Sequence, residues 1–219
     1  TGRKAQLALA AELAELAPSL VSDERRAVAI VVNRVATAKT VYKLLLEKVR
    51  KQGGNDEQVE LMIGRMRPLD RDAQATRLRN LIASDTPADH RPQQPLFVVA
   101  TQCIEVGADL DFDAMISEAA PLDALRQRFG RLNRTGRDIE TQGMVVIQAA
   151  QAKTDHQLDE LEKEKKLDDP VYGNALARTW NRLSNLAKDD GDQRVIDFGI
   201  AAADAWVGRI DRDQLRTQL

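Results

Sequence analysis

The sequence predicts an α/β protein in which helices cover both faces of a parallel sheet. Short apolar runs rich in β-branched residues, such as Ala27 to Val32, alternate along the chain with longer segments of helical periodicity. Each run has the length of a strand that is buried on both faces. Such alternation is typical of parallel strands joined by right-handed helical crossovers, and it gives a sheet of about five strands.

Each expected element has a local signal. The short apolar runs predict strands at residues 27–32, 59–63, 96–100, 114–117 and 144–147. Apolar residues at spacings of three and four predict helices at 5–16, from Thr37 to the glycines at 53–54, from about Pro68 onward, and from Leu122 through the arginines near 130. Pro18 ends the first helix, and Asp70 and Asp72 suit the positive end of the third helix dipole.

The length of 219 residues suits one domain of ordinary size with an appendage, at ~150 residues per domain. We expect an N-terminal linker helix at 1–22, the sheet domain at 23–150 and a helical appendage, or the start of a further domain, at 151–219. The appendage is expected to be purely helical, with helices at 155–166 and 171–186. Because the chain begins at Thr1 and not at methionine, we expect that it was cut from a longer protein.

Composition narrows the class of protein. Hydrophobic residues make up 43% and charged residues 30%, which is typical of a globular chain. No apolar run reaches the ~18 residues that cross a bilayer, so we predict a cytoplasmic protein without a membrane partner. The single Cys103 can form no internal disulfide. His90 and His156 are expected at the surface without a His-Asp dyad, so no metal site is expected in this piece.

Polar residues follow four of the expected strands. These residues are Asn33 with Arg34, Arg65, Thr101 and Glu118. Because ligands bind at the carboxyl ends of the strands in open parallel sheets, we expect these loops to share one ligand-binding edge. The alternative to a ligand contact for Thr101 is a structural role in which its side chain only caps a short helix. None of the twelve glycines belongs to a Gly-x-x-x-x-Gly-Lys-Ser/Thr loop, which would cradle the phosphates of a nucleotide.

Five arginines and no acidic residue lie between Arg126 and Arg137, although the formal net charge of the chain is only -2. On one continuous helix, a polar stripe of Gln127, Arg131 and Arg134 would lie beside a buried stripe of Leu122, Leu125, Phe129 and Leu132. A solvated helix face is the alternative, but such faces usually mix both signs of charge. Gly130 inside a helix would cost ~1 kcal/mol relative to alanine, which suggests that a phosphate or a neighbouring domain approaches closely.

These residues resemble the motifs of a known family. ATQCIEVGAD at 100–109 and QRFGRLNR at 127–134 resemble the fifth and sixth motifs of the C-terminal RecA-like domain of superfamily 2 helicases. VVNRVATAKTVYKLL at 31–45 looks like the fourth motif, and LMIGRMRPLDRD at 61–72 looks like the basic segment after it. Within that superfamily, the DLDFD run at 109–113, the APLD run at 120–123 and the tail pieces VYGNALARTW and VIDFGIAAADA look like the CRISPR-associated helicase-nuclease of type I interference systems.

The resemblance implies a composite ATP site. Arg131 and Arg134 would be catalytic arginine fingers that reach the γ-phosphate of ATP, a device worth ~10³ to 10⁵ in rate. Gly107, Asp109 and Gln127 would bind ATP from the same side. ATP and Mg²⁺ would be held mainly by the N-terminal RecA-like domain of the same parent protein, so this piece alone would be inactive.

The resemblance also implies partners. Asn33, Arg34, Arg65 and Thr101 would hold the backbone of single-stranded DNA without reading bases. The parent protein would be an ATP-dependent DNA translocase or helicase, with a nuclease elsewhere in its chain, that degrades invader DNA after recruitment by an RNA-guided surveillance complex. Alternatives are another superfamily 2 helicase acting on DNA or RNA, a non-catalytic module that binds single strands, and, for the fold, a flavodoxin-like sheet.

Overall fold

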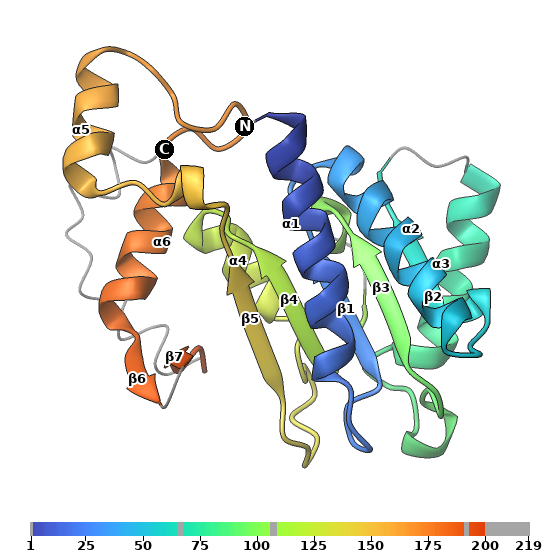
Figure 1. The fold of residues 1–219 in the computed structure, drawn as a ribbon. Helices are drawn as coiled ribbons and strands as arrows, with labels where there is room; N and C mark the ends of the chain where they lie inside the picture. The colour runs from blue at the N-terminus through green and yellow to red at the C-terminus, as the bar shows by residue number, and fades with distance from the viewer. Residues whose placement is uncertain (1, 65–67, 106–108, 191–192, 200–219) are drawn as a thin grey trace. The chain divides into compact units, whose positions relative to one another are not determined.

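Figure 1 shows the computed structural model of the chain, which describes residues 2–64, 68–105, 109–190 and 193–199. Contacts between Cα atoms divide the chain into two compact units, Thr1–Ala150 and Gln151–Leu219. The first unit contains a five-stranded sheet with its helices. Its N-terminal helix, which was expected to be a linker, is part of that unit.

The sheet of the first unit is entirely parallel, with the strand order β2-β3-β1-β4-β5. The strands are β1 (Ala27–Val31), β2 (Val59–Met62), β3 (Leu96–Ala100), β4 (Ala114–Glu118) and β5 (Gln142–Val146). All five residues of the central strand β1 are buried, as its continuous apolar run predicts. The predicted fold class is therefore confirmed.

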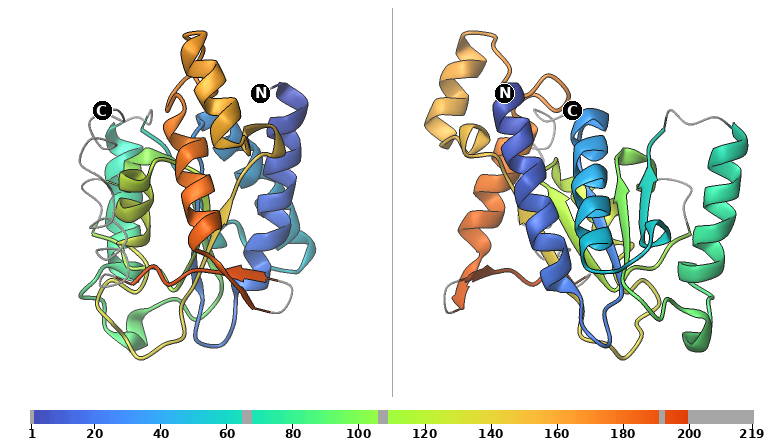
Figure 2. Two further views of the ribbon diagram at one scale, coloured as in Figure 1. Left: turned by 90° about the vertical axis from the view of Figure 1, so that its left-hand side faces the viewer. Right: turned by 45° about the vertical axis from the view of Figure 1, so that its right-hand side comes forward.

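Helices cover both faces of this sheet. They are α1 (Arg3–Leu16), α2 (Val35–Lys51), α3 (Pro68–Ile82) and α4 (Leu122–Phe129), with short 3₁₀ turns η1 (Ala17–Leu20), η2 (Asp56–Gln58), η3 (Ala88–His90), η4 (Gln102–Ile104) and η5 (Ala149–Gln151). The two views of Figure 2 agree that α1 and α2 lie on one face and that α3 and α4 lie on the other.

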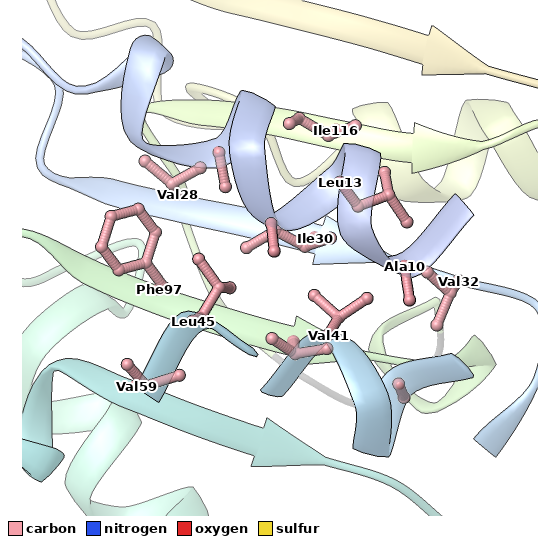
Figure 3. Close-up of a cluster of buried hydrophobic side chains, with 14 of the residues drawn as sticks. Ala10, Leu13, Val28, Ile30, Val32, Val41, Leu45, Val59, Phe97 and Ile116 are labelled. Carbon is pink, nitrogen blue, oxygen red and sulfur yellow. The ribbon is translucent and has the colours of Figure 1, made fainter. Parts of the chain in front are cut away.

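Two apolar clusters attach these helices to the sheet. On the face of α1 and α2, Leu13 and Leu45 pack with Val28 and Ile30 of β1, as Figure 3 shows. On the opposite face, Leu78 of α3 packs with Ala29 and Val31 of β1 and with other residues of the second cluster. Successive residues of β1 thus serve opposite faces, and each fully buried aliphatic side chain contributes about 1.5–3 kcal/mol.

The helix after Pro121 is shorter than predicted. It ends at Phe129, Gly130 is its C-cap, and the expected single polar stripe is therefore wrong. The chain leaves the helix because Phe112 pairs with the next residues. The Phe112 N–H donates to the carbonyl of Arg131, and the Asn133 N–H donates to the carbonyl of Phe112, both at 2.8 Å. Because Gly130 lies at the end of the helix and not inside it, the mid-helix cost that suggested a close phosphate does not apply.

Arg131 and Arg134 instead lie in an irregular segment, residues 130–137, which we call the arginine turn. Asn133 has a left-handed φ of 43° and Gly136 one of 67°. The Asn133 side chain closes the turn, because its Oδ1 accepts the Arg137 N–H at 2.8 Å and its Nδ2 donates to the Arg137 carbonyl at 2.9 Å. Asparagine tolerates this conformation better than most residues.

Arg128 holds the carboxyl ends of the strands together. It is completely buried, and its Nε bonds to Glu105 Oε1 at 2.8 Å. Its Nη1 donates at 3.0 Å to the Ser117 hydroxyl and to the Glu118 carbonyl. Its Nη2 donates at 3.0 Å to Asn33 Oδ1. One guanidinium therefore connects α4 with the end of β4, the loop after β1 and the segment after β3.

The second unit contains α5 (Asp155–Lys163), α6 (Ala175–Leu186), and the antiparallel strands β6 (Lys188–Asp190) and β7 (Gln193–Val195). The strand pair shows that the expectation of a purely helical appendage is wrong. The helix expected from Val171 begins at Ala175, because Asp169 Oδ1 accepts the N–H groups of Val171 and Tyr172 and holds them in a turn. Arg178 links α6 to α5 through an ion pair with Asp159 at 2.8 Å.

The Arg128 network predicts a large loss of stability when its guanidinium is removed. Arg128→Met leaves the mostly buried Glu105 carboxylate without its cation, and we expect the free energy of unfolding to fall by about 3–5 kcal/mol. Arg126→Met, on the exposed side of the same helix, is expected to change it by at most about 1 kcal/mol, because exposed ion pairs contribute no more than that. Urea denaturation of the 219-residue chain measures both changes, and equal values for the two variants would contradict this role of Arg128.

Candidate functional site

Asn33, Thr101 and Glu118 lie at one edge of the sheet, as predicted. The Asn33 N–H donates to Glu118 Oε2 at 2.7 Å, which joins the loop after β1 to the end of β4. Gln102 Nε2 donates to the Asn33 carbonyl at 3.0 Å and brings in the segment after β3. Thr101 is buried, and its N–H donates to the carbonyl of Met62 at the end of β2. The carboxyl ends of four neighbouring strands therefore form one connected edge.

Arg34 lies at the start of α2 on this edge. Its backbone is extended, it is the N-cap of α2, and its side chain is partly exposed. The first turn of α2 contains no acidic residue of its own, and the Glu118 carboxylate lies just before it on the Asn33 N–H. Arg34 and the helix N-terminus together favour an anion here. Arg65, predicted to act with them, lies outside the described residues.

Glu118 is the buried acceptor of this edge. Burial raises the pKa of its carboxyl group, while the hydrogen bond from the Asn33 main chain and the charge of Arg128 act in the opposite direction. Its carboxylate fixes the loop that carries Asn33 and Arg34. Its position inside the edge suits a structural acceptor better than a group that meets a ligand directly.

The arginine turn brings a second group of predicted residues together. Arg134 Nη1 forms an ion pair with Asp109 Oδ1, and Asp109 also accepts the Ser84 hydroxyl at 2.8 Å. The Arg134 side chain is 42% exposed and that of Asp109 is 52% exposed. Such an exposed pair is worth only ~0–1 kcal/mol, so an incoming anion can replace the carboxylate. Gly107, expected beside this pair, lies outside the described residues.

Arg131 lies beside Arg134 in a more buried position. Its Nη2 donates to the Glu105 carbonyl at 3.2 Å, whereas its buried Nε has no hydrogen-bond partner among the described residues. Burial lowers the pKa of the Arg131 guanidinium, the charge of Arg134 lowers it further, and Asp109 opposes both effects. Arginine stays protonated at neutral pH, so this site offers an unsatisfied cationic donor.

Gln127 is exposed on α4, and its role as a nucleotide contact stays a prediction. The roles assigned to the other eight residues stay predictions as well, although the structure places six of those residues. The two described groups, the sheet edge and the arginine turn, are joined by Glu105. Its carboxylate pairs with Arg128, and its main-chain oxygen accepts a hydrogen bond from Arg131.

Sequence reasoning assigned no role to Glu105 or Arg128, or to Asp111 and Asp113 within the DLDFD run. The last two occur at every second position of the DLDFD run, an alternation that places them on one side of an extended segment. Both are buried and pair with Arg137 and with Arg91. Arg91 is the buried residue of segment 84–95, which is otherwise exposed or partly exposed.

The chemistry of the site suits contact with a phosphate that is held elsewhere. The two guanidinium groups can stabilise negative charge, and no phosphate-cradling loop occurs in the sequence. Among the described residues, no group of three or more His, Cys, Asp or Glu side chains is arranged to hold a metal ion. In the same part of the chain, no helix is both long and apolar enough to cross a membrane.

Comparison with known proteins identifies the family. The family model described as CRISPR-associated nuclease/helicase Cas3, C-terminal, matches residues 24–137, more than half of the chain. The CRISPR-associated endonuclease/helicase Cas3 of Escherichia coli K12 is 29% identical over 142 residues, which cover 61% of this chain and 15% of that protein. The chain spans between 5% and 28% of the length of the curated relatives it matches.

Solved structures have the same fold. The crystal structure of T. fusca Cas3 with ADP has a TM-score of 0.57 and 25% identity, over 66% of this chain and 17% of that one. A chain in a CRISPR RNA-guided surveillance complex, in a pre-nicking state, has a TM-score of 0.57 and 23% identity, over 91% of this chain and 22% of that one. These likenesses confirm the RecA-like arrangement of the sheet. With the family match over more than half its length, the chain belongs to the family of Cas3 C-terminal regions.

Proposed function

We propose that the chain is the second motor domain of an ATP-dependent helicase that moves along single-stranded DNA. The observation that carries the proposal is the connection between two different surfaces. One is the sheet edge with Asn33 and Thr101, and the other is the arginine turn. Glu105 and Arg128 join them through buried hydrogen bonds and an ion pair. A motor needs such a connection, since it must link the state of a nucleotide to its grip on a strand.

In this proposal the ATP site is completed by an N-terminal RecA-like domain of the parent protein. That domain would hold most of the ATP and the Mg²⁺, which neutralises charge on the β- and γ-phosphates. Arg131 and Arg134 would point at the γ-phosphate, with Gly107, Asp109 and Gln127 near the nucleotide. The exposed Arg134–Asp109 pair fits such a contact. A Cas3 structure of the same fold contains ADP, which supports a nucleotide as the ligand.

DNA would lie along the strand-end edge. Asn33, Arg34, Arg65 and Thr101 would hold its sugar-phosphate backbone, helped by the N-terminus of α2. Such contacts read no bases, so they suit a motor that moves along any sequence. Family membership extends the proposal to CRISPR interference, in which the parent protein would unwind and degrade invader DNA with a nuclease elsewhere in its chain. The surveillance-complex structure of the same fold supports an RNA-guided complex as the recruiting partner.

The arginine-finger assignment predicts a loss of turnover in the parent protein. Arg131→Ala and Arg134→Ala are each expected to lower kcat for DNA-stimulated ATP hydrolysis by at least about 10³, because negative charge on the phosphoryl group loses its cation. Single-strand binding is expected to stay within about threefold of the unmodified protein, since neither residue lies at the DNA edge. Steady-state ATPase assays and fluorescence anisotropy measure the two properties.

Arg79→Ala is the matched control, because it removes the same charge from an exposed position on α3. Its turnover is expected to be unchanged. Near-normal turnover in both Arg131→Ala and Arg134→Ala would exclude arginine fingers. Single-strand binding that is indifferent to nucleotide in the parent protein would favour a non-catalytic binding module, and stimulation by RNA alone would favour another superfamily 2 helicase.

The proposed binding of DNA at the sheet edge predicts that Arg34 contributes to the salt dependence of binding. Arg34→Ala is expected to weaken binding of single strands equally for all sequences. It is also expected to reduce the slope of the logarithm of the binding constant against the logarithm of the salt concentration by about 0.7, the value for the loss of one phosphate contact. Lys43→Ala, an exposed change within α2, is expected to leave the slope unchanged. Anisotropy titrations of the parent protein at several salt concentrations measure both slopes. An unchanged slope in Arg34→Ala would remove Arg34 from the interface.

A further inference from the structure

The acids of the DLDFD run play different parts in the first unit. Asp111 and Asp113 are 0% and 3% exposed, whereas Asp109 is exposed. A buried carboxylate is stable only where donors surround it. The donors of Asp111 and Asp113 come from different segments of the chain, and that difference separates their roles.

Asp111 binds the main chain of the arginine turn. Its Oδ1 accepts the N–H of Arg134 at 2.8 Å. Its Oδ2 accepts the Thr135 hydroxyl at 3.1 Å and Arg137 Nε at 3.0 Å. The neighbouring Phe112 exchanges main-chain hydrogen bonds with both sides of Leu132. The Arg134 backbone is therefore fixed by a buried charge, while its guanidinium stays at the surface.

Asp113 binds the start of the sheet instead. Its Oδ2 accepts the N–H groups of Arg26 and Ala27, at 2.9 and 2.7 Å. Its Oδ1 accepts Arg137 Nη2 at 2.7 Å and Arg91 Nη2 at 3.1 Å. It shares Arg137 and Arg91 with Asp111, but within the described part of the chain it makes no hydrogen bond to Arg134. Asp113 is thus matched to Asp111 in charge and burial, with four donors against three, and it differs in the main chain that it holds.

We propose that Asp111 is a positioning residue for the two catalytic arginines, acting through the Arg134 main chain. This inference rests on the proposed function, in which Arg131 and Arg134 reach the γ-phosphate. The two oxygens of Asp111 accept three donors. Asparagine at this position keeps only one of these oxygens and has an NH₂ group in place of the other, so the donors to the replaced oxygen lose their acceptor. The arginine turn would then shift, and a shift of about 1 Å at a catalytic group can lower a rate by about 10²-fold.

The test compares Asp111→Asn with Asp113→Asn in the parent protein. Both variants are expected to lower the melting temperature by similar amounts, because each disrupts one buried carboxylate. Only Asp111→Asn is expected to lower kcat for DNA-stimulated ATP hydrolysis, by about 10- to 100-fold, with little change in KM for ATP. Rates are measured well below both melting temperatures. A purely structural role would give equal losses of kcat in the two variants, or none, and either result would overturn the proposal.

Arg131→Ala and Arg134→Ala are measured beside them. If these two keep their turnover, the proposed function fails whatever Asp111→Asn does. If they lose turnover while Asp111→Asn behaves like Asp113→Asn, only the positioning role fails. Should Asp111→Asn not fold, Thr135→Val removes one donor of the same carboxylate at an exposed residue. It is expected to lower kcat about two- to tenfold, and an unchanged kcat would count against the proposal.

Discussion

The buried guanidinium of Arg128 is the interaction on which the functional half of the first unit depends. A charge inside a protein is tolerated only when it is paired and hydrogen-bonded, and the planar fork of arginine meets that need in several directions. Here it reaches Glu105, Asn33 and the end of β4. Because these partners lie at the ends of different strands, none can move far without leaving a buried charge unpaired. The sheet edge and the arginine turn are therefore parts of one rigid framework.

Arginines that are neighbours in sequence thus have unlike environments. Arg128 is completely buried, and Arg137 pairs with the buried Asp111 and Asp113. Arg134 is exposed and forms an ion pair with the exposed Asp109. The phosphate site predicted from the concentration of positive charge therefore concerns only some of these arginines. The others balance acids that are far away in sequence. A count of arginines cannot separate the two kinds, because the partners that decide between them come together only in the folded chain.

The strands were predictable because each depends on a short local run, and Leu96–Ala100 has the bounds that its apolar run predicts. The meeting of Asn33 and Thr101 at one edge followed from the geometry of parallel sheets. The end of α4 was not predictable, since it depends on main-chain bonds to Phe112, a partner distant in sequence. Gly143 of β5 gave no local signal either: a Cβ there would lie 2.8 Å from the Phe129 ring, a contact made by the tertiary packing.

The arginine turn combines strong contacts to the Arg134 backbone with a weak contact to the Arg134 side chain. The Arg134 N–H bonds to a buried carboxylate, whereas its guanidinium bonds to an exposed one. Hydrogen bonds to buried charges contribute about 1.5–3 kcal/mol, and exposed ion pairs contribute about 0–1 kcal/mol. An arriving phosphate can therefore replace Asp109 at little cost while the backbone stays in place. A donor fixed before its ligand arrives needs little reorganisation during the reaction, which is the condition for effective electrostatic catalysis.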